Sequence, residues 1–396
     1  MKNHGREIDT DISIQELSPD YNKLHYHDKI FSLDNMKKRK MFSSDSTYIH
    51  NGKSGDVPKN LMNVDQKIDS EEIITLFKNT SGDIDTITIT NRKDGSTIEF
   101  TRLKGKIYAA IKRDYVEPLT AIDFGVPLEQ KVQELEDVDE ETPLSNATQK
   151  MACSSYRQID IALAYESTFC AANGGVSNVA DLAATNLIAG SSTYFQQDGL
   201  CIILFIRHLE GYCNPNSDIY KEHVDTGLSG CSNDGLIDGF QEIWLADRKL
   251  TRRDIALLFT GQVLQCINGE CINGCVYDQG ICTYNSDQDN GFAVMNPMFT
   301  SDFTTQSIFI THEMAHTCGA LHENVGGNAV SIMSENYLEN GFANSFSQTS
   351  IDRINKILEN KNCVKAADAN LIPDCRNSSL RGAFALMAKS WSNSTL

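Results

Sequence analysis

The order of apolar patterns predicts an α/β (α+β) fold, with a mostly parallel, twisted sheet in the second part of the chain. Strand-length and helix-length patterns alternate there, which is typical of a sheet covered by helices. The expected strands are a period-2 segment at 159–165 and an apolar run at Leu200–Arg207, separated by a helix over Ser177–Ile188. An amphipathic helix over Leu236–Trp244 then precedes a buried strand over Asp254–Thr260.

The composition is that of an ordinary folded protein with an excess of acid. The 396 residues include 53 acidic and 35 basic side chains, which gives a net charge of −18. Apolar residues make up 40% and charged residues 22%, which excludes fibrous and wholly disordered classes. The longest strongly apolar run, Cys201–Ile206, is far shorter than the ~20 residues that span a bilayer, so we expect no membrane span. The acidic balance argues against nucleic acid as a partner, because phosphate binding needs clustered Lys and Arg.

The N-terminal part of the chain has a different pattern. Residues 1–70 are polar and aperiodic, and we interpret the basic run Lys37–Lys40 as a solvated charge cluster in a flexible segment, with a processing or nuclear signal as the alternative. Asp85–Ile111 alternates like strands, and the turn signal at Asp94–Gly95 predicts a hairpin.

An acidic stretch, 129–141, is typical of a flexible linker and predicts a domain boundary between about 130 and 155. We therefore expect a β-rich region over 1–150, a larger domain over 151–365 and a short tail over 366–396.

All twelve cysteines lie between Cys153 and Cys375. An even number at irregular spacing favours disulfides and a secreted or extracellular location. The N-terminal sequence MKNHGREIDTDISIQ has no apolar stretch typical of a signal peptide. A structural zinc site is the alternative for four of the cysteines, whose gaps lack the paired C-x2-C spacing. These are Cys266, Cys271, Cys275 and Cys282.

One motif indicates a catalytic metal site. Residues 312–322 read HEMAHTCGALH, which is H-E-x-x-H-x-x-G-x-x-H. Residues four apart lie on one face of a helix, so His312 and His316 have the spacing of two metal ligands. Gly319 allows the chain to reverse, which lets His322 return as a third ligand. Three protein ligands leave a fourth position for water, which is typical of catalytic zinc.

These residues and those that follow resemble the metzincin metalloproteases, in which a methionine turn lies beneath the zinc. Here Ser331–Ser334 contains Met333 at that position. Within the metzincins the chain looks most like the adamalysin or reprolysin (ADAM-like) group. The strand Arg253–Gly261 resembles that group's D-x-x-x-L-L-T-G segment, and Phe346–Cys363 resembles its C-terminal helix. Two residues depart from the pattern: Glu323 follows the third histidine where adamalysins usually carry Asp, and Ser331 replaces a cysteine.

The resemblance implies a zinc-dependent endopeptidase that hydrolyses protein or peptide substrates. His312, His316 and His322 would bind one Zn²⁺, and Glu313 would act as general base and then as general acid. Met333 would pack beneath the site without binding the metal. The segment Gly274–Thr283 would provide an edge strand along the cleft.

Two other functions and one further ion site are compatible with parts of the sequence. The main alternative is a catalytically inactive extracellular adhesion or binding protein on the same scaffold. A serine or cysteine hydrolase is disfavoured because no G-x-S-x-G segment is present and because Cys318 is expected to form a disulfide. A Ca²⁺ loop at Asn285, Asp287 and Asp289 has its glycine one place late and lacks the closing Glu, so no clear motif supports calcium.

The N-terminal region is also expected to keep the enzyme latent, as the propeptides of this family do. Gln149–Cys153 partly resembles the family's P-K-M-C-G-V switch, in which a thiolate binds the open zinc position. Ala152 is inserted before Cys153, however, and a structural disulfide at Cys153 is the favoured alternative. Under either hypothesis, removal of residues 1–150 is expected to raise activity.

Overall fold

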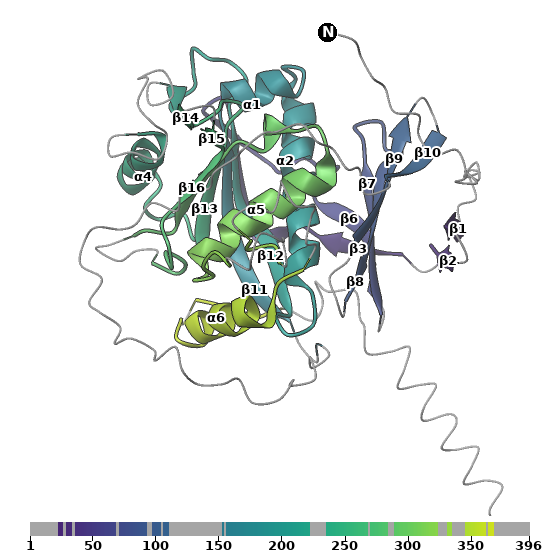
Figure 1. Cartoon of the computed structure of the whole chain (residues 1–396). Helices are drawn as coiled ribbons and strands as arrows, with labels where there is room; N and C mark the ends of the chain where they lie inside the picture. Colours follow the sequence, from purple (N-terminus) through teal and green to yellow (C-terminus); the bar gives the residue numbers. More distant parts are fainter. Residues whose placement is uncertain are drawn as a thin grey trace, which may run out of the picture.

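The computed structural model describes residues 23–26, 29–33, 36–68, 71–92, 97–103, 106–110, 153, 156–221, 235–267, 270–283, 289–323, 331–334, 345–361 and 363–367. They form an α+β fold built on two main sheets, one with mostly parallel strands and one with antiparallel strands (Figure 1).

The larger sheet has parallel strands at its centre. Its order is β16-β17-β13-β11-β12-β4-β5, and β18 pairs with β11 outside this path. The pairings from β17 through β13, β11 and β12 to β4 are parallel, whereas β16, β5 and β18 pair antiparallel. The bounds are β16 (Gly274–Val276), β17 (Phe292–Met295), β13 (Ile255–Phe259), β11 (Arg157–Tyr165), β12 (Ile202–Gly211), β4 (Phe42–His50), β5 (Lys53–Gly55) and β18 (Lys365–Ala366).

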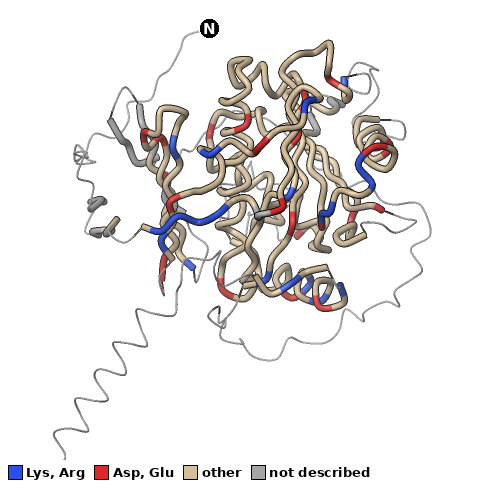
Figure 2. Tube along the Cα trace, turned by 180° about the vertical axis from the view of Figure 1, so that it is seen from behind, with Lys and Arg blue, Asp and Glu red and all other residues tan. Residues whose placement is uncertain are grey.

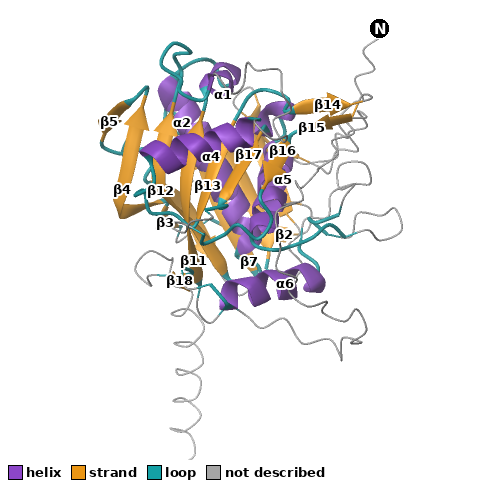
Figure 3. Cartoon of the chain, turned by 90° about the vertical axis from the view of Figure 1, so that its left-hand side faces the viewer, coloured by secondary structure: helices purple, strands orange, loops and turns teal. Residues whose placement is uncertain are grey.

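Helices cover both faces of this sheet, which explains why its strands are almost continuously apolar. On β11 and β13, Ile161 and Leu257 pack on the side of α2 and α5, whereas Ala162 and Leu258 pack on the side of α4. In Figure 3, α4 crosses the near face of the strands. The helices are α1 (Ser167–Ala172), α2 (Ser177–Phe195), α4 (Leu236–Asp247), α5 (Phe303–Thr317) and α6 (Gln348–Glu359), with a 3-10 turn η1 at Pro297–Phe299. No helix in the described residues is long and apolar enough to cross a membrane.

The second sheet is antiparallel and comes from the N-terminal part of the chain, in the order β10-β9-β8-β7-β6-β3. The hairpin predicted around Asp94–Gly95 is confirmed as β8–β9. The strands are β3 (Lys37–Lys40), β6 (Asn63–Ile68), β7 (Glu72–Lys78), β8 (Ile84–Asn91), β9 (Thr97–Leu103) and β10 (Lys106–Ala110). Two hairpins stand apart: β1 (Lys23–Tyr26) with β2 (Lys29–Ser32), and β14 (Gln265–Ile267) with β15 (Glu270–Ile272).

The prediction of an aperiodic segment over residues 1–70 was wrong where the structure describes it. The basic run Lys37–Lys40 is strand β3, and its Arg39 is fully buried. The guanidinium donates hydrogen bonds to Ser192 Oγ at 3.0 Å and to the Leu204 carbonyl at 2.6 Å. A buried cation needs such partners, and these lie more than 150 positions away in the sequence. The acidic stretch and the expected tail after residue 367 lie outside the described residues.

The N-terminal part of the chain is built into the larger sheet. Strand β4 pairs in parallel with β12, so Thr47 lies opposite His208 and Tyr48 opposite Leu209. The regions 1–150 and 151–365 therefore share one sheet.

Acidic and basic positions are interspersed along the described trace of both sheets (Figure 2).

Candidate metal site

The first two histidines lie near the end of α5, a helix that is buried along most of its length. Asp302 caps the beginning of the helix, and its carboxylate accepts a hydrogen bond from the Thr305 amide at 2.8 Å. His312 and His316 follow on one face, with exposed fractions of 0% and 3%. The sheet lies on one side of α5 and α2 on another, so neither imidazole is free to turn towards solvent.

The chain reverses after α5 because Gly319 has a φ of +92°. The Gly319 amide bonds to the His316 carbonyl at 2.9 Å, and the Ala320 amide bonds to the Ala315 carbonyl at 3.0 Å, which closes the helix end. A Cβ at Gly319 would lie 2.5 Å from Ile357 Cγ1 of α6, so glycine is needed for space as well as for conformation. The reversal brings His322 back to the other two histidines.

The three histidines converge through their Nε2 atoms. These atoms are 3.1 Å apart between His312 and His316, 3.1 Å between His316 and His322, and 3.3 Å between His312 and His322. A tetrahedral zinc with nitrogen ligands at about 2.0–2.1 Å requires about 3.3 Å between its ligands. The donor set and its spacing therefore fit zinc, and the three residues form a group able to hold a metal.

Hydrogen bonds at the other ring nitrogen orient two of these ligands. His312 Nδ1 lies 2.6 Å from the Ile332 carbonyl oxygen, and His316 Nδ1 lies 2.7 Å from the Ala320 carbonyl oxygen. A carbonyl oxygen only accepts, so each Nδ1 carries a proton, and in the neutral imidazole the Nε2 atom then keeps its lone pair. Lone pairs that converge at 3.1 Å repel unless a cation lies between them, which is the reason that this cluster favours a metal.

Glu313 is fully buried beside the first histidine. Its carboxyl group lies against the backbone of Gly274 in β16, the antiparallel edge strand of the larger sheet. Glu313 thus follows His312 directly in α5, and its carboxyl group contacts the strand that the sequence predicted along the cleft. The edge strand itself is shorter than predicted and ends at Val276.

The turn around Met333 is joined to the third histidine by Glu323. The Glu323 amide bonds to the Met333 carbonyl at 2.8 Å, and Met333 is fully buried. The Glu323 carboxylate accepts hydrogen bonds from Ser331 Oγ at 2.5 Å, from Ser350 Oγ at 2.6 Å and from the hydroxyl of Ser347. In the sequence Glu323 and Ser331 are two separate departures from the family pattern, whereas in the structure they are hydrogen-bond partners. Serines on both sides of this turn are the only sequence signal of the link.

The disulfide pairing of the cysteines bears on two expectations, the latency switch at Cys153 and the alternative zinc cluster. Described disulfides join Cys153 to Cys201, Cys170 to Cys213 and Cys282 to Cys363. The structure therefore favours the structural alternative for Cys153, because a sulfur in a disulfide is no thiolate for zinc. Cys275 is also disulfide-bonded, so neither it nor Cys282 is available to the alternative zinc cluster.

Cys318 was expected to form a disulfide, and this expectation is wrong: the thiol is free and fully buried at the end of α5. Burial raises the pKa of this thiol to about 12, so it is not an activated nucleophile. Asp289, one of the three residues spaced like calcium-loop ligands, forms a buried ion pair with Arg253 at 2.5 Å, while Asn285 and Asp287 lie outside the described residues.

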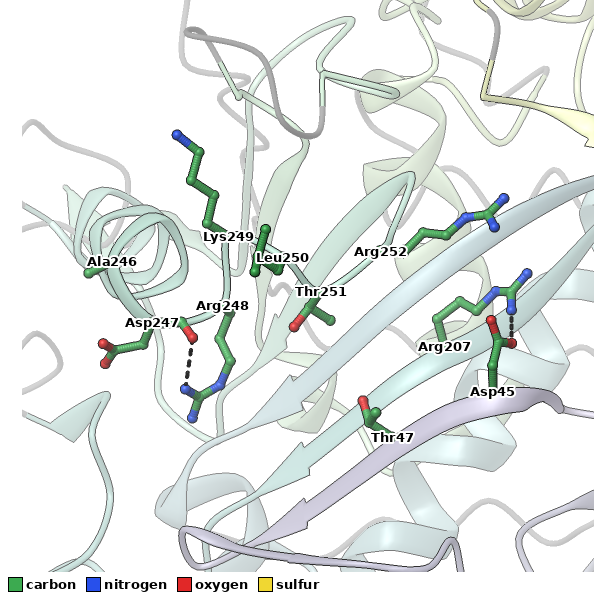
Figure 4. A pocket seen from close by; sticks show the side chains of 10 residues that line it. All are labelled: Asp45, Thr47, Arg207, Ala246, Asp247, Arg248, Lys249, Leu250, Thr251 and Arg252. Carbon is green, nitrogen blue, oxygen red and sulfur yellow. Dashed lines mark hydrogen bonds and ion pairs between the residues drawn. The ribbon is translucent and has the colours of Figure 1, made fainter.

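A separate pocket of about 480 Å³ lies on the face of the larger sheet opposite α5 (Figure 4). Three of its cationic side chains form ion pairs: Arg207 with Asp45 and Asp160, Arg248 with Glu210, and Arg252 with Asp160 at 3.9 Å. None of the residues that line this pocket belongs to the group of three histidines.

Comparison with known proteins finds no family model and no curated protein that matches the chain. Among solved structures, the chain is similar to metalloproteinase-II from Bacteroides fragilis, with a TM-score of 0.44 and 13% identity. The alignment covers 85% of this chain and 90% of that chain. A likeness at this TM-score carries no argument about function, so a functional proposal depends on the histidine site.

Proposed function

We propose that this protein is a zinc-dependent metalloendopeptidase of the metzincin class. Within that class we propose the adamalysin or reprolysin-like group, on the motifs around Met333 and in β13. The observation that carries the proposal is the convergence of three Nε2 atoms at 3.1–3.3 Å, together with the fully buried Glu313 that follows His312 in the chain. Protein or peptide substrates follow from the class of reaction.

Each residue of the site has its own role in the proposed hydrolysis of a peptide bond. His312, His316 and His322 would hold the ion, which, when bound, supplies Lewis acidity for polarising the scissile carbonyl and the attacking water. Glu313 takes the proton of that water and passes it to the leaving amine. The carbonyl oxygens of Ile332 and Ala320 keep two of the imidazoles in the tautomer that a metal ligand requires.

A catalytically inactive adhesion protein on the same scaffold is the competing hypothesis. Such a protein would be expected to have lost Glu313 or one of the histidines, and all four residues are present. Nothing in the site geometry favours this alternative over an enzyme.

The direct test is metal-dependent cleavage. The full chain, and the same chain cut at a protease site inserted near residue 130, are incubated with a library of quenched peptides. We expect about one zinc per chain, cleavage that a chelator abolishes, and recovery when Zn²⁺ is added back. The His316→Ala variant is the matched control and should neither bind the metal stoichiometrically nor cleave. Cleavage that persists in metal-free protein would contradict the proposal, as would a zinc-loaded cut chain that cleaves nothing.

We further propose that the protein functions in an oxidising compartment and is secreted. The three described disulfides support this, because such bonds persist outside the reducing cytosol. Alkylation of the protein from its native cells, followed by mass spectrometry, should show that these six cysteines react with the alkylating reagent only after reduction. Recovery of a fully reduced chain from the cytosol would contradict a secreted location.

A further inference from the structure

We propose that Gly274 is a positioning residue for the general base, because the missing side chain at this position leaves the space that the Glu313 carboxyl group occupies. The inference rests on the proposed peptidase function. A Cβ built on Gly274 would lie 2.0 Å from Glu313 Oε1, 2.2 Å from Cδ and 2.9 Å from Cγ. Real Cβ atoms essentially never approach another heavy atom to less than 3.0 Å, so a methyl group here would displace the carboxyl group by at least about 1 Å.

The requirement at Gly274 concerns space and not backbone conformation. Gly274 is absent from the residues with positive φ, and it pairs with Met295 in the regular ladder between β16 and β17. Alanine can therefore adopt the backbone of Gly274. The effect of a side chain at this position falls on Glu313 and not on the strand.

Neither backbone can give way easily. Strand β16 is held by its pairing to β17 and by a bond from the Asn296 amide to the Asn273 carbonyl at 2.7 Å. Helix α5 is packed against α2, where a Cβ at Gly190 would lie 2.3 Å from Ser307 Oγ. Because both elements are fixed, the added methyl group is accommodated by a change in the Glu313 side chain. A general base that is misplaced by about 1 Å costs about 10²-fold in rate.

The experiment compares Gly274→Ala with the wild type in the full chain, cut near residue 130 where cutting is needed for activity. We expect kcat to fall about 10²-fold while KM changes less than about 3-fold. Zinc stoichiometry and zinc affinity, measured by competition with a chromophoric chelator, should stay at wild-type values because no histidine is touched. Gly55→Ala in β5 is the matched control, since its Cβ would lie 3.7 Å from Tyr48 Cδ1 in ordinary contact; it should leave both rate and zinc binding unchanged.

A second background tests the steric link itself. Glu313→Asp shortens the side chain by one methylene and withdraws the carboxyl group from β16. Adding Gly274→Ala to this background should cost less than about 3-fold in kcat, and the loss in melting temperature caused by Gly274→Ala should also shrink. The change in melting temperature is a readout that does not depend on activity.

The outcomes separate the two proposals. If the wild type shows no chelator-sensitive cleavage, the proposed function fails. If the wild type is active and Gly274→Ala keeps its kcat, only the positioning inference fails. The positioning inference also fails if Gly274→Ala lowers kcat equally in the wild-type and Glu313→Asp backgrounds, or if Gly274→Ala causes loss of zinc. Either result would mean that the substitution disturbs the fold as a whole and not the position of the Glu313 carboxyl group.

Discussion

The direction in which the histidine nitrogens point is set by carbonyl oxygens that come after them in the chain. The Ala320 carbonyl lies in the reversal after α5, and the Ile332 carbonyl lies in the turn that contains Met333. Each accepts a hydrogen bond from an Nδ1 atom and so directs the Nε2 atom of the neutral imidazole towards the other histidines. The candidate metal site therefore depends on the two turns as much as on the helix.

The proposed ligand His316 and the proposed base Glu313 make contributions to activity that can be measured separately. Glu313→Gln keeps the size of the side chain but cannot take a proton, so zinc should remain stoichiometric while the rate falls by about 10²–10⁴-fold. His316→Ala removes an Nε2 ligand, so the metal itself should be lost. Metal analysis and initial rates on the same preparations distinguish the two. Wild-type turnover in Glu313→Gln would rule out the assigned base.

The turn that contains Met333 depends on Glu323, because the Glu323 carboxylate accepts hydrogen bonds from the hydroxyls of Ser331, Ser347 and Ser350. Glu323→Ala leaves these hydroxyls without that acceptor and should lower the free energy of unfolding by about 1–3 kcal/mol. It should also weaken zinc binding, since the Met333 turn carries the Ile332 carbonyl that orients His312. Glu323→Gln retains an acceptor oxygen and serves as the control. Urea unfolding and zinc competition measure the two effects, and equal behaviour of the two variants would contradict this role.

At the scale of elements, the beginning of β13 is tied to its neighbours by a buried acid. The Asp254 carboxylate accepts a hydrogen bond from the Asp160 amide of β11 at 2.8 Å, and the Asp254 carbonyl accepts one from the Cys282 amide at 3.0 Å. Burial raises the pKa of the Asp254 carboxyl group from 3.8 to about 7. The hydrogen bond from the Asp160 amide and the charges of Arg252 and Arg207 oppose this increase, whereas the charge of the Asp160 carboxylate adds to it.

This shift predicts how stability depends on pH. Between about pH 4 and pH 7 the native state holds a proton on Asp254 that the unfolded chain has released. The contribution of Asp254 to stability is therefore greatest below about pH 4 and falls as the pH rises to about 7. Asp254→Asn removes this ionisation and should flatten the dependence. Burial also raises the pKa of Glu166, Asp181 and Asp218, so the measured quantity is the difference between the variant and the wild type in urea unfolding at several pH values. A difference that stays constant from pH 4 to 7 would contradict the assignment.

At the scale of the whole molecule, the N-terminal part of the chain acts as a structural partner of the larger sheet. Besides β4 and Arg39, a buried ion pair joins Arg92 to Asp198 at 2.8 Å. Glu99 of β9 accepts a hydrogen bond from the Thr304 amide at 3.0 Å, at the beginning of α5. Thr304 lies about 12 Å along the helix from His312, so these contacts support α5 from the end away from the histidines.

This arrangement changes the expected result of removing residues 1–150. Deletion takes β4 out of the sheet and leaves Asp198 buried without Arg92, which alone costs about 3–5 kcal/mol. We expect a chain that begins at residue 151 to be insoluble or to melt about 10 °C or more below the full chain. A chain cut near residue 130 keeps both pieces and should melt close to the uncut protein. Differential scanning calorimetry of the three samples makes the comparison, and an equally stable truncated chain would show that the N-terminal contacts are dispensable.

The features that depend on local geometry could be predicted from the sequence. The four-residue spacing of His312 and His316, the reversal at Gly319 and the alternation of strands and helices each follow from a helical or extended repeat within a few residues. Three other features became known from the three-dimensional fold: Cys153 joins Cys201, Arg39 is buried, and Glu323 binds three serines. In addition, the Glu313 carboxyl group lies where Gly274 lacks a side chain. These contacts join residues far apart in the chain, and a local repeat carries no information about which distant segment will supply the partner.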